Sequence, residues 1–213
     1  MKAISRLQYF TQESLLFTYE EQIKLISSYG CNSVHLKIKN SFEKEYLKVA
    51  EKCVKITHEN NSKFIVWDFP DVALKIRADG VHFTNPNSIE LKVIKKCSQE
   101  FEMGCSVNSL DDVIGLQHKF DYLFLGPYEN RASESEQSSI IGITGYKTLI
   151  DEMVRKKMYT PIIAAGGIRL TDVAFLASSG IHGLAISTGI LEVNDIALEI
   201  KKFQAAIKSG WEI

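Results

Sequence analysis

The chain has 213 residues, of which 45% are hydrophobic and 24% charged, and its formal net charge at pH 7 is −1. This length and apolar content suit a single domain with a sizeable core, and the scattered, balanced charge predicts neither a nucleic-acid partner nor a membrane partner. No apolar run approaches the roughly 18 residues of a membrane span, and no apolar signal core precedes the first strand pattern. We therefore expect a cytoplasmic protein that binds small molecules, and we leave open whether it forms a homo-oligomer.

Short apolar runs alternate along the chain with longer amphipathic runs, a pattern typical of parallel strands joined by crossover helices. The predicted strands are, in chain order, Arg6–Phe10, Ser33–Lys39, Phe64–Trp67, Val81–Phe83, Met103–Val107, Tyr122–Leu125 and two strands within 161–167 and 183–189. The predicted helices are 18–30, Phe42–Asn60, Pro70–Ile76, Ser88–Cys97, one after Ser109, Gly145–Met158, one between the last two strands, and Asn194–Lys208. Eight repeats favour an α/β fold of the (β/α)8 TIM-barrel type over an open doubly wound sheet, and no G-x-G-x-x-G follows the first strand.

Local signals support these boundaries. Thr18 and Glu21 have the spacing of a capping box, and Ser109 can cap the helix that follows it. Asp79 and Asp121 precede their strands, at the barrel end opposite the expected site, and are predicted to be structural. The cysteines lack C-x-x-C spacing, which predicts reduced, structural thiols; they are Cys31, Cys53, Cys97 and Cys105.

The strongest ligand signal lies in residues 161–190. An apolar run ends in Gly166 and Gly167, and a second run, Gly183–Gly189, follows one helix later. Glycine has no Cβ, so the backbone can close around an anion and offer its N–H groups. The loops after the last two strands of a barrel commonly form such a phosphate site. The sequence therefore predicts a phosphorylated substrate.

The second predicted strand places His35, Lys37 and Lys39 at alternate positions, so all three side chains are expected to face the barrel interior. Inward lysines are costly to bury without an anion, which points to a phosphate or carboxylate partner. The alternatives are a strand with a wet face and lysines that only surround the barrel mouth.

Other polar residues lie where strands end. Asp68 follows the third strand and either holds Mg²⁺ or caps the helix that begins at Pro70. His82 lies inside the fourth strand, where a core histidine with satisfied hydrogen bonds is expected. Ser106 and Asn108 end the fifth strand and reach the same rim.

The most specific motif is Ala78–Phe83, reading A-D-G-V-H-F, and it is supported by Asp71–Leu74, Gly126-Pro127, Ile163–Ile168 and Gly183–Ser187. Together these segments resemble the family of thiamine phosphate synthases and the related thiazole tautomerases. The resemblance extends over essentially the whole chain and implies a phosphate-binding (β/α)8 barrel.

The resemblance also implies substrates, a cofactor and roles. A thiazole phosphate would be held by Gly167 and by the backbone around Ser187 and Thr188, facing an aminopyrimidine diphosphate bound with Mg²⁺. The diphosphate leaves to give a pyrimidine carbocation, which the thiazole nitrogen captures to form thiamine phosphate. The implied catalytic residues are Lys37, Lys39 and Ser106, the remaining substrate contacts are His35, Trp67, Asn108 and Arg131, and the metal positions are Asp68 and Asn87.

The chain departs from the family pattern at several of these positions. The second-strand pattern Q-L-R-x-K is here H-L-K-I-K, the third-strand pattern N-D-R is W-D-F, and the second metal-binding aspartate aligns with Asn87. Arg131 opens a segment with two glutamates where the synthases carry a T-x-T-K segment. Two alternatives stay open: a tautomerase that uses His35 or His82 as proton shuttle, because the tautomerase histidine aligns with Asn108, and a barrel that binds thiamine phosphate or its precursors without turnover.

Overall fold

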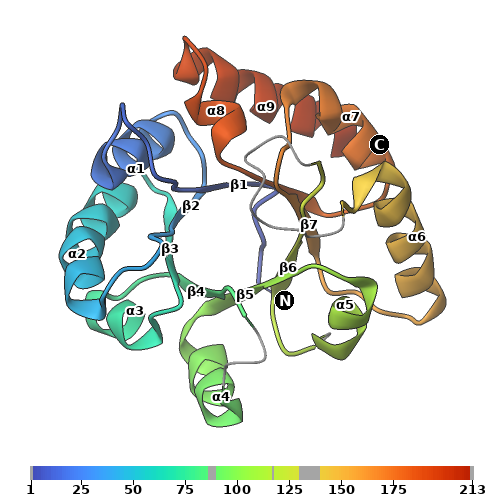
Figure 1. Ribbon diagram of the computed structural model, residues 1–213, viewed down its shortest axis with the longest axis horizontal. Coiled ribbons are helices and arrows are strands. Elements are labelled where there is room, and N and C mark those ends of the chain that lie inside the picture. The colour runs from blue at the N-terminus through green and yellow to red at the C-terminus, as the bar shows by residue number, and fades with distance from the viewer. Residues whose placement is uncertain (1, 86–89, 117, 130–139, 212–213) are drawn as a thin grey trace.

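The computed structural model describes residues 2–85, 90–116, 118–129 and 140–211. Within these ranges, eight parallel strands follow one another around a closed barrel, because each strand pairs with the next and β8 pairs with β1 (Figure 1). The strands are β1 (Leu7–Phe10), β2 (Ser33–Leu36), β3 (Lys63–Trp67), β4 (Gly80–Phe83), β5 (Glu102–Val107), β6 (Tyr122–Leu125), β7 (Ile162–Ala165) and β8 (Gly183–Ile186). The predicted barrel is confirmed, and the open doubly wound sheet is excluded.

The helices surround the barrel, as Figure 1 shows. They are α1 (Tyr19–Ser28), α2 (Glu43–Glu59), α3 (Pro70–Ile76), α4 (Leu91–Glu100), α5 (Leu110–Leu116), α6 (Gly142–Arg155), α7 (Val173–Ser178) with a preceding 3-10 turn (Leu170–Asp172), α8 (Thr188–Leu191) and α9 (Ile196–Trp211). The short helix α8, directly after β8, was not predicted as a separate element. It places a helix N-terminus at the carboxyl end of the barrel, where the predicted phosphate site lies.

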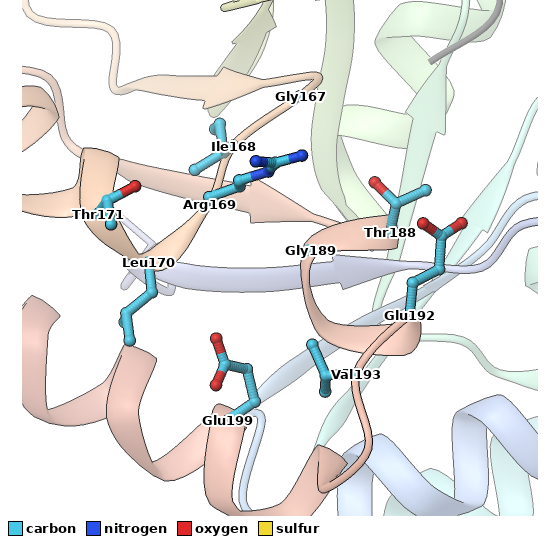
Figure 2. A pocket seen from close by; sticks show the side chains of 10 residues that line it. All are labelled: Gly167, Ile168, Arg169, Leu170, Thr171, Thr188, Gly189, Glu192, Val193 and Glu199. Carbon is cyan, nitrogen blue, oxygen red and sulfur yellow. The ribbon is translucent and has the colours of Figure 1, made fainter. Parts of the chain in front are cut away.

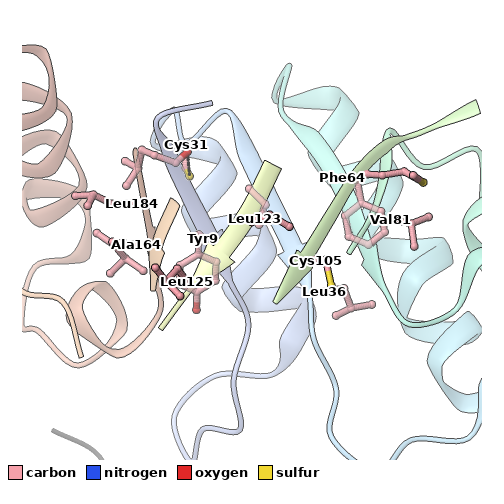
Figure 3. Close-up of a cluster of buried hydrophobic side chains, with 14 of the residues drawn as sticks. Tyr9, Cys31, Leu36, Phe64, Val81, Cys105, Leu123, Leu125, Ala164 and Leu184 are labelled. Atoms are coloured by element: carbon pink, nitrogen blue, oxygen red, sulfur yellow. Dashed lines mark hydrogen bonds between the residues drawn. The ribbon is translucent and has the colours of Figure 1, made fainter. Parts of the chain in front are cut away.

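Each strand has one face toward the helices and one toward the barrel interior, because successive side chains point to opposite sides of the sheet. Both faces are buried. On β6, Leu123 and Leu125 pack outward against the helices, in the large core that Figure 3 shows. Tyr122 and Phe124 point into the barrel, where they form a second cluster with Trp67 and neighbouring apolar residues. The aromatic content of the inner cluster means that the barrel interior is filled beneath its mouth.

Local capping follows the sequence. The Thr18 hydroxyl oxygen accepts a hydrogen bond from the Glu21 backbone N–H at 3.2 Å, and the Glu21 carboxylate accepts one from the Thr18 N–H at 2.8 Å. Ser109 Oγ accepts from the Asp112 N–H at 3.1 Å. These bonds satisfy N–H groups that the first turn of a helix leaves without partners, so they confirm both predicted helix starts.

The amino-terminal end of the barrel is closed by structural hydrogen bonds. One carboxylate oxygen of Asp79 accepts from the Phe64 N–H at 2.8 Å, and one of Asp121 accepts from the Met103 N–H, also at 2.8 Å. Both aspartates therefore connect neighbouring strands, as predicted, and lie at the end opposite the expected site.

The cysteines are all free and buried, which confirms their predicted structural role; they are Cys31, Cys53, Cys97 and Cys105. Burial raises the pKa of the Cys31 thiol to about 12, so this thiol stays protonated. Among the residues that the structure describes, no helix has both the length and the apolar content needed to cross a bilayer.

Several predicted boundaries differ from the structure by one to three residues. The second strand ends at Leu36 and not at Lys39, because its last pairing is between Leu36 and Val66. Helix α6 begins at Gly142, three residues before the predicted start. Helix α4 runs from Leu91 to Glu100, and the predicted start at Ser88 lies outside the described residues.

Candidate active site

Two neighbouring cavities at the carboxyl ends of the strands contain most of the predicted site residues. The first, which we call the mouth cavity, has a volume of about 230 Å³. It is lined by Phe10, Lys37, Trp67, Ser106, Val107, Asn108, Phe124, Gly126, Pro127, Ala165 and Gly166. The second, the outer cavity, has a volume of about 660 Å³ (Figure 2). It is lined by Gly167, Ile168, Arg169, Leu170, Thr171, Thr188, Gly189, Glu192, Val193 and Glu199. Because Gly166 lines one cavity and Gly167 the other, the two spaces adjoin at consecutive residues.

The mouth cavity has an aromatic floor, formed by Phe10, Trp67 and Phe124, and the Lys37 ammonium lies above this floor. The ring centroid of Trp67 lies 6.0 Å from that of Phe10 and 6.2 Å from that of Phe124. The Lys37 ammonium lies 4.6 Å from the Trp67 ring centroid and 5.5 Å from that of Phe10. Such distances give cation–π attraction. The rings of Trp67 and Phe10 therefore stabilise the Lys37 ammonium at the barrel mouth.

His35 lies beneath this floor and is fully buried. Its Nδ1 accepts a hydrogen bond from the Trp67 indole N–H at 3.1 Å, and its Nε2 lies 2.8 Å from Gln8 Oε1. Indole nitrogen can only donate, so the His35 proton must be on Nε2. Burial lowers the pKa of His35 to about 3, so the ring is neutral. His35 faces the interior as predicted, but it is fully buried and is not among the residues that line the mouth cavity, so its predicted substrate contact stays a prediction.

His82 lies beside Trp67, stacked on it with ring centroids 4.2 Å apart. Its Nε2 is 2.9 Å from the Ser106 hydroxyl oxygen and its Nδ1 is 3.3 Å from the Tyr122 hydroxyl. Burial lowers the pKa of His82 well below its usual value, and its interactions with His35 and with the Lys37 ammonium lower that pKa further. The prediction of a core histidine with satisfied hydrogen bonds is confirmed. Its partner Ser106 lines the mouth cavity, as the sequence predicts.

Lys39 does not join Lys37. Strand β2 ends at Leu36, and Lys39 is exposed in the turn that follows, where Asn40 has a φ of 52°. The alternation that predicts three inward side chains applies only while the backbone stays extended. The prediction that Lys39 faces the barrel interior is therefore wrong, whereas Lys37 does reach the mouth cavity.

Asp68 has left-handed backbone geometry, with a φ of 61°, directly after β3. One carboxylate oxygen accepts from the Thr84 N–H at 2.7 Å and the other from the Thr84 hydroxyl at 2.6 Å. Residue Phe69, and not Asp68, precedes the first turn of α3, and no side chain caps that helix. The helix-cap alternative for Asp68 is therefore wrong.

The magnesium alternative for Asp68 fits its surroundings. Asp68 lines a separate cavity of about 470 Å³ together with Thr84, Asn85 and Glu90. Each carboxylate oxygen uses one lone pair on Thr84 and keeps another for a cation. Within the described residues no group of three or more His, Cys, Asp or Glu side chains gathers at one point, but Mg²⁺ bound to substrate phosphates needs only one or two protein carboxylates. Asn87, the other predicted metal position, and Arg131 lie outside the described residues.

Asn108 connects two strand ends at the rim of the mouth cavity. With its amide nitrogen turned inward, it donates to the carbonyl oxygens of Val107 and Gly126, each at 3.2 Å. These donors are then occupied, so the side-chain oxygen is the group that Asn108 offers to a ligand.

The outer cavity depends on glycine at two points. Gly167 has a φ of 72°, and a Cβ atom there would overlap the carbonyl oxygen of Glu129. A Cβ atom at Gly189 would overlap the carbonyl oxygen of Ile168. The first close approach joins the loops after β6 and β7, and the second joins those after β7 and β8, so the cavity wall is backbone at the positions where a phosphate was predicted.

Polar side chains complete the outer cavity. Figure 2 shows Arg169 and Thr188 on the side of the cavity next to Gly167, with Glu192 beyond Thr188. Ser187 precedes α8, and its buried hydroxyl oxygen has no hydrogen-bond partner among the described residues. The Tyr9 hydroxyl lies near enough to Ser187 for the two to interact, but it donates its proton to Gln22 Oε1 at 2.9 Å. Gly167 and Thr188, both expected at the phosphate site, line this cavity together.

The thiamine monophosphate synthase family profile matches residues 7–190 of this chain. The chain belongs to this family. The thiamine-phosphate synthase of Flavobacterium johnsoniae is 30% identical over 197 residues, with 90% of each chain covered. That of Phocaeicola vulgatus is 27% identical over 197 residues, covering 92% of this chain and 95% of the relative. The fold is similar to that of thiamine phosphate pyrophosphorylase from Pyrococcus furiosus, with a TM-score of 0.80, 23% identity and 96% of each chain covered.

Three residues of the site were not singled out from the sequence: Phe124, Arg169 and Thr84. Phe124 lines the mouth cavity, and the alternation of Tyr122-Leu-Phe-Leu125 could have identified it as inward facing. Arg169 lines the outer cavity, and its place directly after the Gly-Gly-Ile run at the end of β7 could have singled it out. Nothing in the sequence indicated that Thr84 would bind Asp68, because the two residues follow different strands, β4 and β3.

Proposed function

We propose that the chain is a thiamine-phosphate synthase, which joins an aminopyrimidine methyl diphosphate to a thiazole phosphate and releases pyrophosphate. The observation that carries this proposal is the pair of cavities that adjoin at Gly166 and Gly167. One has a cation and an aromatic floor and the other a backbone wall, so the two cavities suit two different phosphorylated heterocycles.

The outer cavity is the site proposed for the thiazole phosphate. Backbone N–H groups at the start of α8 and the close approach at Gly167 suit a phosphate monoester. Thr188 adds a hydroxyl donor to the same wall. The thiazole ring would then extend toward Gly166 and the mouth cavity.

The mouth cavity is the site proposed for the pyrimidine diphosphate. Trp67 and Phe124 offer faces on which a planar ring can stack, and the Lys37 ammonium lies above them. In the reaction, the bond between the methylene carbon and the diphosphate oxygen breaks, and its electron pair leaves with the oxygen. The thiazole nitrogen then supplies the lone pair of the new C–N bond.

The chain's own contribution to this step is electrostatic. Lys37 stabilises the negative charge that develops on the leaving diphosphate, and the aromatic floor stabilises the positive charge left on the pyrimidine methylene group. Both effects strengthen as the bond breaks, which is the requirement for catalysis. Ser106 and the side-chain oxygen of Asn108 orient the ring at the rim.

Magnesium is part of the proposal. Asp68 retains a lone pair on each carboxylate oxygen and would hold Mg²⁺ from the β3 side of the site, with Asn87 as the second position implied by the family pattern. When bound, Mg²⁺ supplies further neutralisation of the diphosphate.

The tautomerase alternative requires a histidine that reaches the ligand. Both histidines are fully buried and neither is among the residues that line the mouth cavity. Neither histidine carries the proton of an acid at neutral pH, because burial lowers the pKa of both. The geometry therefore favours the synthase over the tautomerase.

The test is to incubate the purified protein with both substrates and Mg²⁺ and to quantify thiamine phosphate and pyrophosphate. We expect equal amounts of the two products. Absence of product above background would contradict the proposal. In that case, calorimetry showing tight binding of thiamine phosphate would identify a binding protein, and metal-independent interconversion of thiazole tautomers would identify an isomerase.

A further inference from the structure

A chain of hydrogen bonds runs from the barrel interior to the mouth cavity. It links the Tyr122 hydroxyl to His82 Nδ1 at 3.3 Å, and His82 Nε2 to the Ser106 hydroxyl oxygen at 2.9 Å. Tyr122 and His82 are fully buried, and Ser106 lines the mouth cavity. These hydrogen bonds, which we call the relay, therefore connect the buried Tyr122 hydroxyl to the Ser106 hydroxyl, which a ligand in the mouth cavity can reach.

The Tyr122 ring has a place built for it. A Cβ atom at Gly104, on the neighbouring strand β5, would overlap the Tyr122 ring and its hydroxyl oxygen. The missing side chain at Gly104 thus lets the Tyr122 hydroxyl lie beside His82. Among the described residues, His82 Nδ1 is the one hydrogen-bond partner of this hydroxyl.

These contacts fix which atom donates and which accepts in each hydrogen bond of the relay. The Tyr122 proton has one acceptor, so His82 Nδ1 must be unprotonated. A neutral imidazole then carries its proton on Nε2 and donates it to the Ser106 oxygen. The reverse order would leave a buried phenolic proton without an acceptor. His35 has the same tautomer for an independent reason, because it accepts from the Trp67 indole.

His82 also stays neutral. It lies 5.8 Å from the His35 ring, stacks on Trp67, and is repelled as a cation by the Lys37 ammonium above that ring. The side chains of the described residues that face its ring from the neighbouring strands are Tyr122 and Phe124 on β6 and Ser106 on β5, and none of them carries a negative charge. Asp68, after β3, contacts His82 through its backbone N–H, which donates to the His82 carbonyl oxygen at 3.0 Å. Among the described residues, no side chain bonded to or stacked on the His82 ring would therefore favour a second proton on it.

We propose that Tyr122 and His82 are positioning residues that hold the Ser106 hydroxyl as a hydrogen-bond donor toward the mouth cavity, so that this cavity selects a planar ring with an unprotonated ring nitrogen. With its oxygen accepting from His82, Ser106 has its own proton free for a ligand. The ligand class rests on the proposed function, because an aminopyrimidine has such nitrogens. The direction of the hydrogen bonds from Tyr122 to His82 and from His82 to Ser106 does not depend on that function.

The relay is tested first without any ligand. The nitrogen-15 spectrum of histidine-labelled protein should show His82 with a protonated Nε2 and an unprotonated Nδ1 from about pH 5 to about pH 9. The Tyr122→Phe substitution removes the donor to Nδ1 and should move the proton partly to that atom. A wild-type spectrum with the proton on Nδ1, or with a doubly protonated ring, would overturn the proposal.

The selectivity is tested with two unreactive probes in which carbon replaces the ester oxygen, one built on the aminopyrimidine ring and one on the matching aminobenzene ring. We expect the wild type to bind the pyrimidine probe about 100-fold more tightly, because a polar group left unpaired discriminates strongly against an analogue. Tyr122→Phe should reduce this preference about 10-fold by weakening only the pyrimidine probe. Ser106→Ala should abolish the preference.

The matched control is Tyr146→Phe, which removes a buried hydroxyl that donates to the Leu125 carbonyl oxygen away from His82. It should leave the preference unchanged. If Tyr122→Phe folds as the wild type does and keeps the full preference, the relay does not set the selectivity and the proposal is wrong. If the wild type binds neither probe while its spectrum shows the proton on Nε2, the relay is upheld, and the ligand assignment fails together with the proposed function.

Discussion

The outer cavity and the mouth cavity adjoin at Gly166 and Gly167, yet they are built in different ways. The outer cavity takes its critical wall from backbone in the loops after β7 and β8, where Gly167 and Gly189 allow close approach. The mouth cavity takes its walls from side chains on strands far apart in the sequence, including Phe10, Lys37 and Ser106. A backbone wall needs only small residues in a short run, whereas a side-chain wall changes with every substitution. Substitutions at Lys37 or Trp67 should therefore alter the mouth cavity directly, whereas the outer cavity depends on its glycines.

The largest effect is expected from removing the backbone wall. Gly167→Ala places a Cβ atom against the Glu129 carbonyl at a φ of 72° and should displace the loop that forms the cavity. We expect thiazole phosphate binding to weaken and synthase turnover to fall by about 1,000-fold, the range of losing preorganised backbone donors. Steady-state kinetics and calorimetry with thiazole phosphate measure both effects.

The control for this substitution is Gly115→Ala in α5, where a Cβ atom would meet open space. It should leave activity unchanged and slightly stabilise the helix. Equal activity of the Gly167→Ala variant and the wild type would show that the outer cavity does not hold the substrate phosphate.

The next largest effect separates the two lysines of the second-strand region. Lys37→Ala removes the cation above the aromatic floor and should lower kcat about 100-fold. Lys39→Ala changes an exposed side chain in a turn and should alter kcat less than about 3-fold. If the Lys39 substitution proved the more damaging of the two, our assignment of the mouth cavity as the diphosphate site would fail.

A smaller effect is expected at the proposed magnesium position. Asp68→Asn keeps the shape of the side chain but removes its charge, and should raise the Mg²⁺ concentration needed for half-maximal activity about 10-fold. Asp71→Asn, which changes an exposed aspartate on the neighbouring helix α3, is the matched control. A magnesium titration that is identical for Asp68→Asn and wild type would remove Asp68 from the metal site.

The smallest effect concerns the histidines beneath the mouth cavity. Burial lowers the pKa of His35 to about 3 and also lowers that of His82, whereas an unfolded histidine titrates near pH 6.5. Between about pH 6.5 and pH 3 the unfolded chain binds more protons, so stability is full above this window and falls as the pH is lowered. Each histidine contributes up to about 1.4 kcal/mol per pH unit.

Urea denaturation at pH 7 and at pH 5 measures this dependence. The His35→Gln variant should lose less of its remaining stability over the interval than the wild type does. His118→Asn, at an exposed position, should behave as the wild type does. An unfolding free energy with the same pH dependence in wild type and His35→Gln would mean that His35 is not held neutral.

The fold could be predicted from the sequence because its signals are local. Strand β6 and helix α3 have the predicted boundaries, and the Thr18 capping box forms as its spacing indicates. The glycine run at Gly167 also indicated the position of the outer cavity, since the left-handed backbone there is a local property of glycine.

The rest of the site depends on contacts between strands, which one sequence does not reveal. The indole of Trp67 on β3 reaches His35 on β2, and the Asp68 carboxylate binds Thr84 beyond β4. Lys39 was misplaced because the alternation was extended beyond Leu36, where pairing with β3 stops. Strand ends are set by pairing partners and turns, and the sequence of a single strand does not specify them.

The most direct test of the two-cavity account is a crystal structure of the protein with thiazole phosphate, pyrophosphate and Mg²⁺. We predict the phosphate monoester against the backbone of Gly167, Thr188 and Gly189, and the pyrophosphate at the mouth cavity within reach of Lys37. A structure with both ligands in one cavity, or with the monoester away from Gly167, would contradict the account.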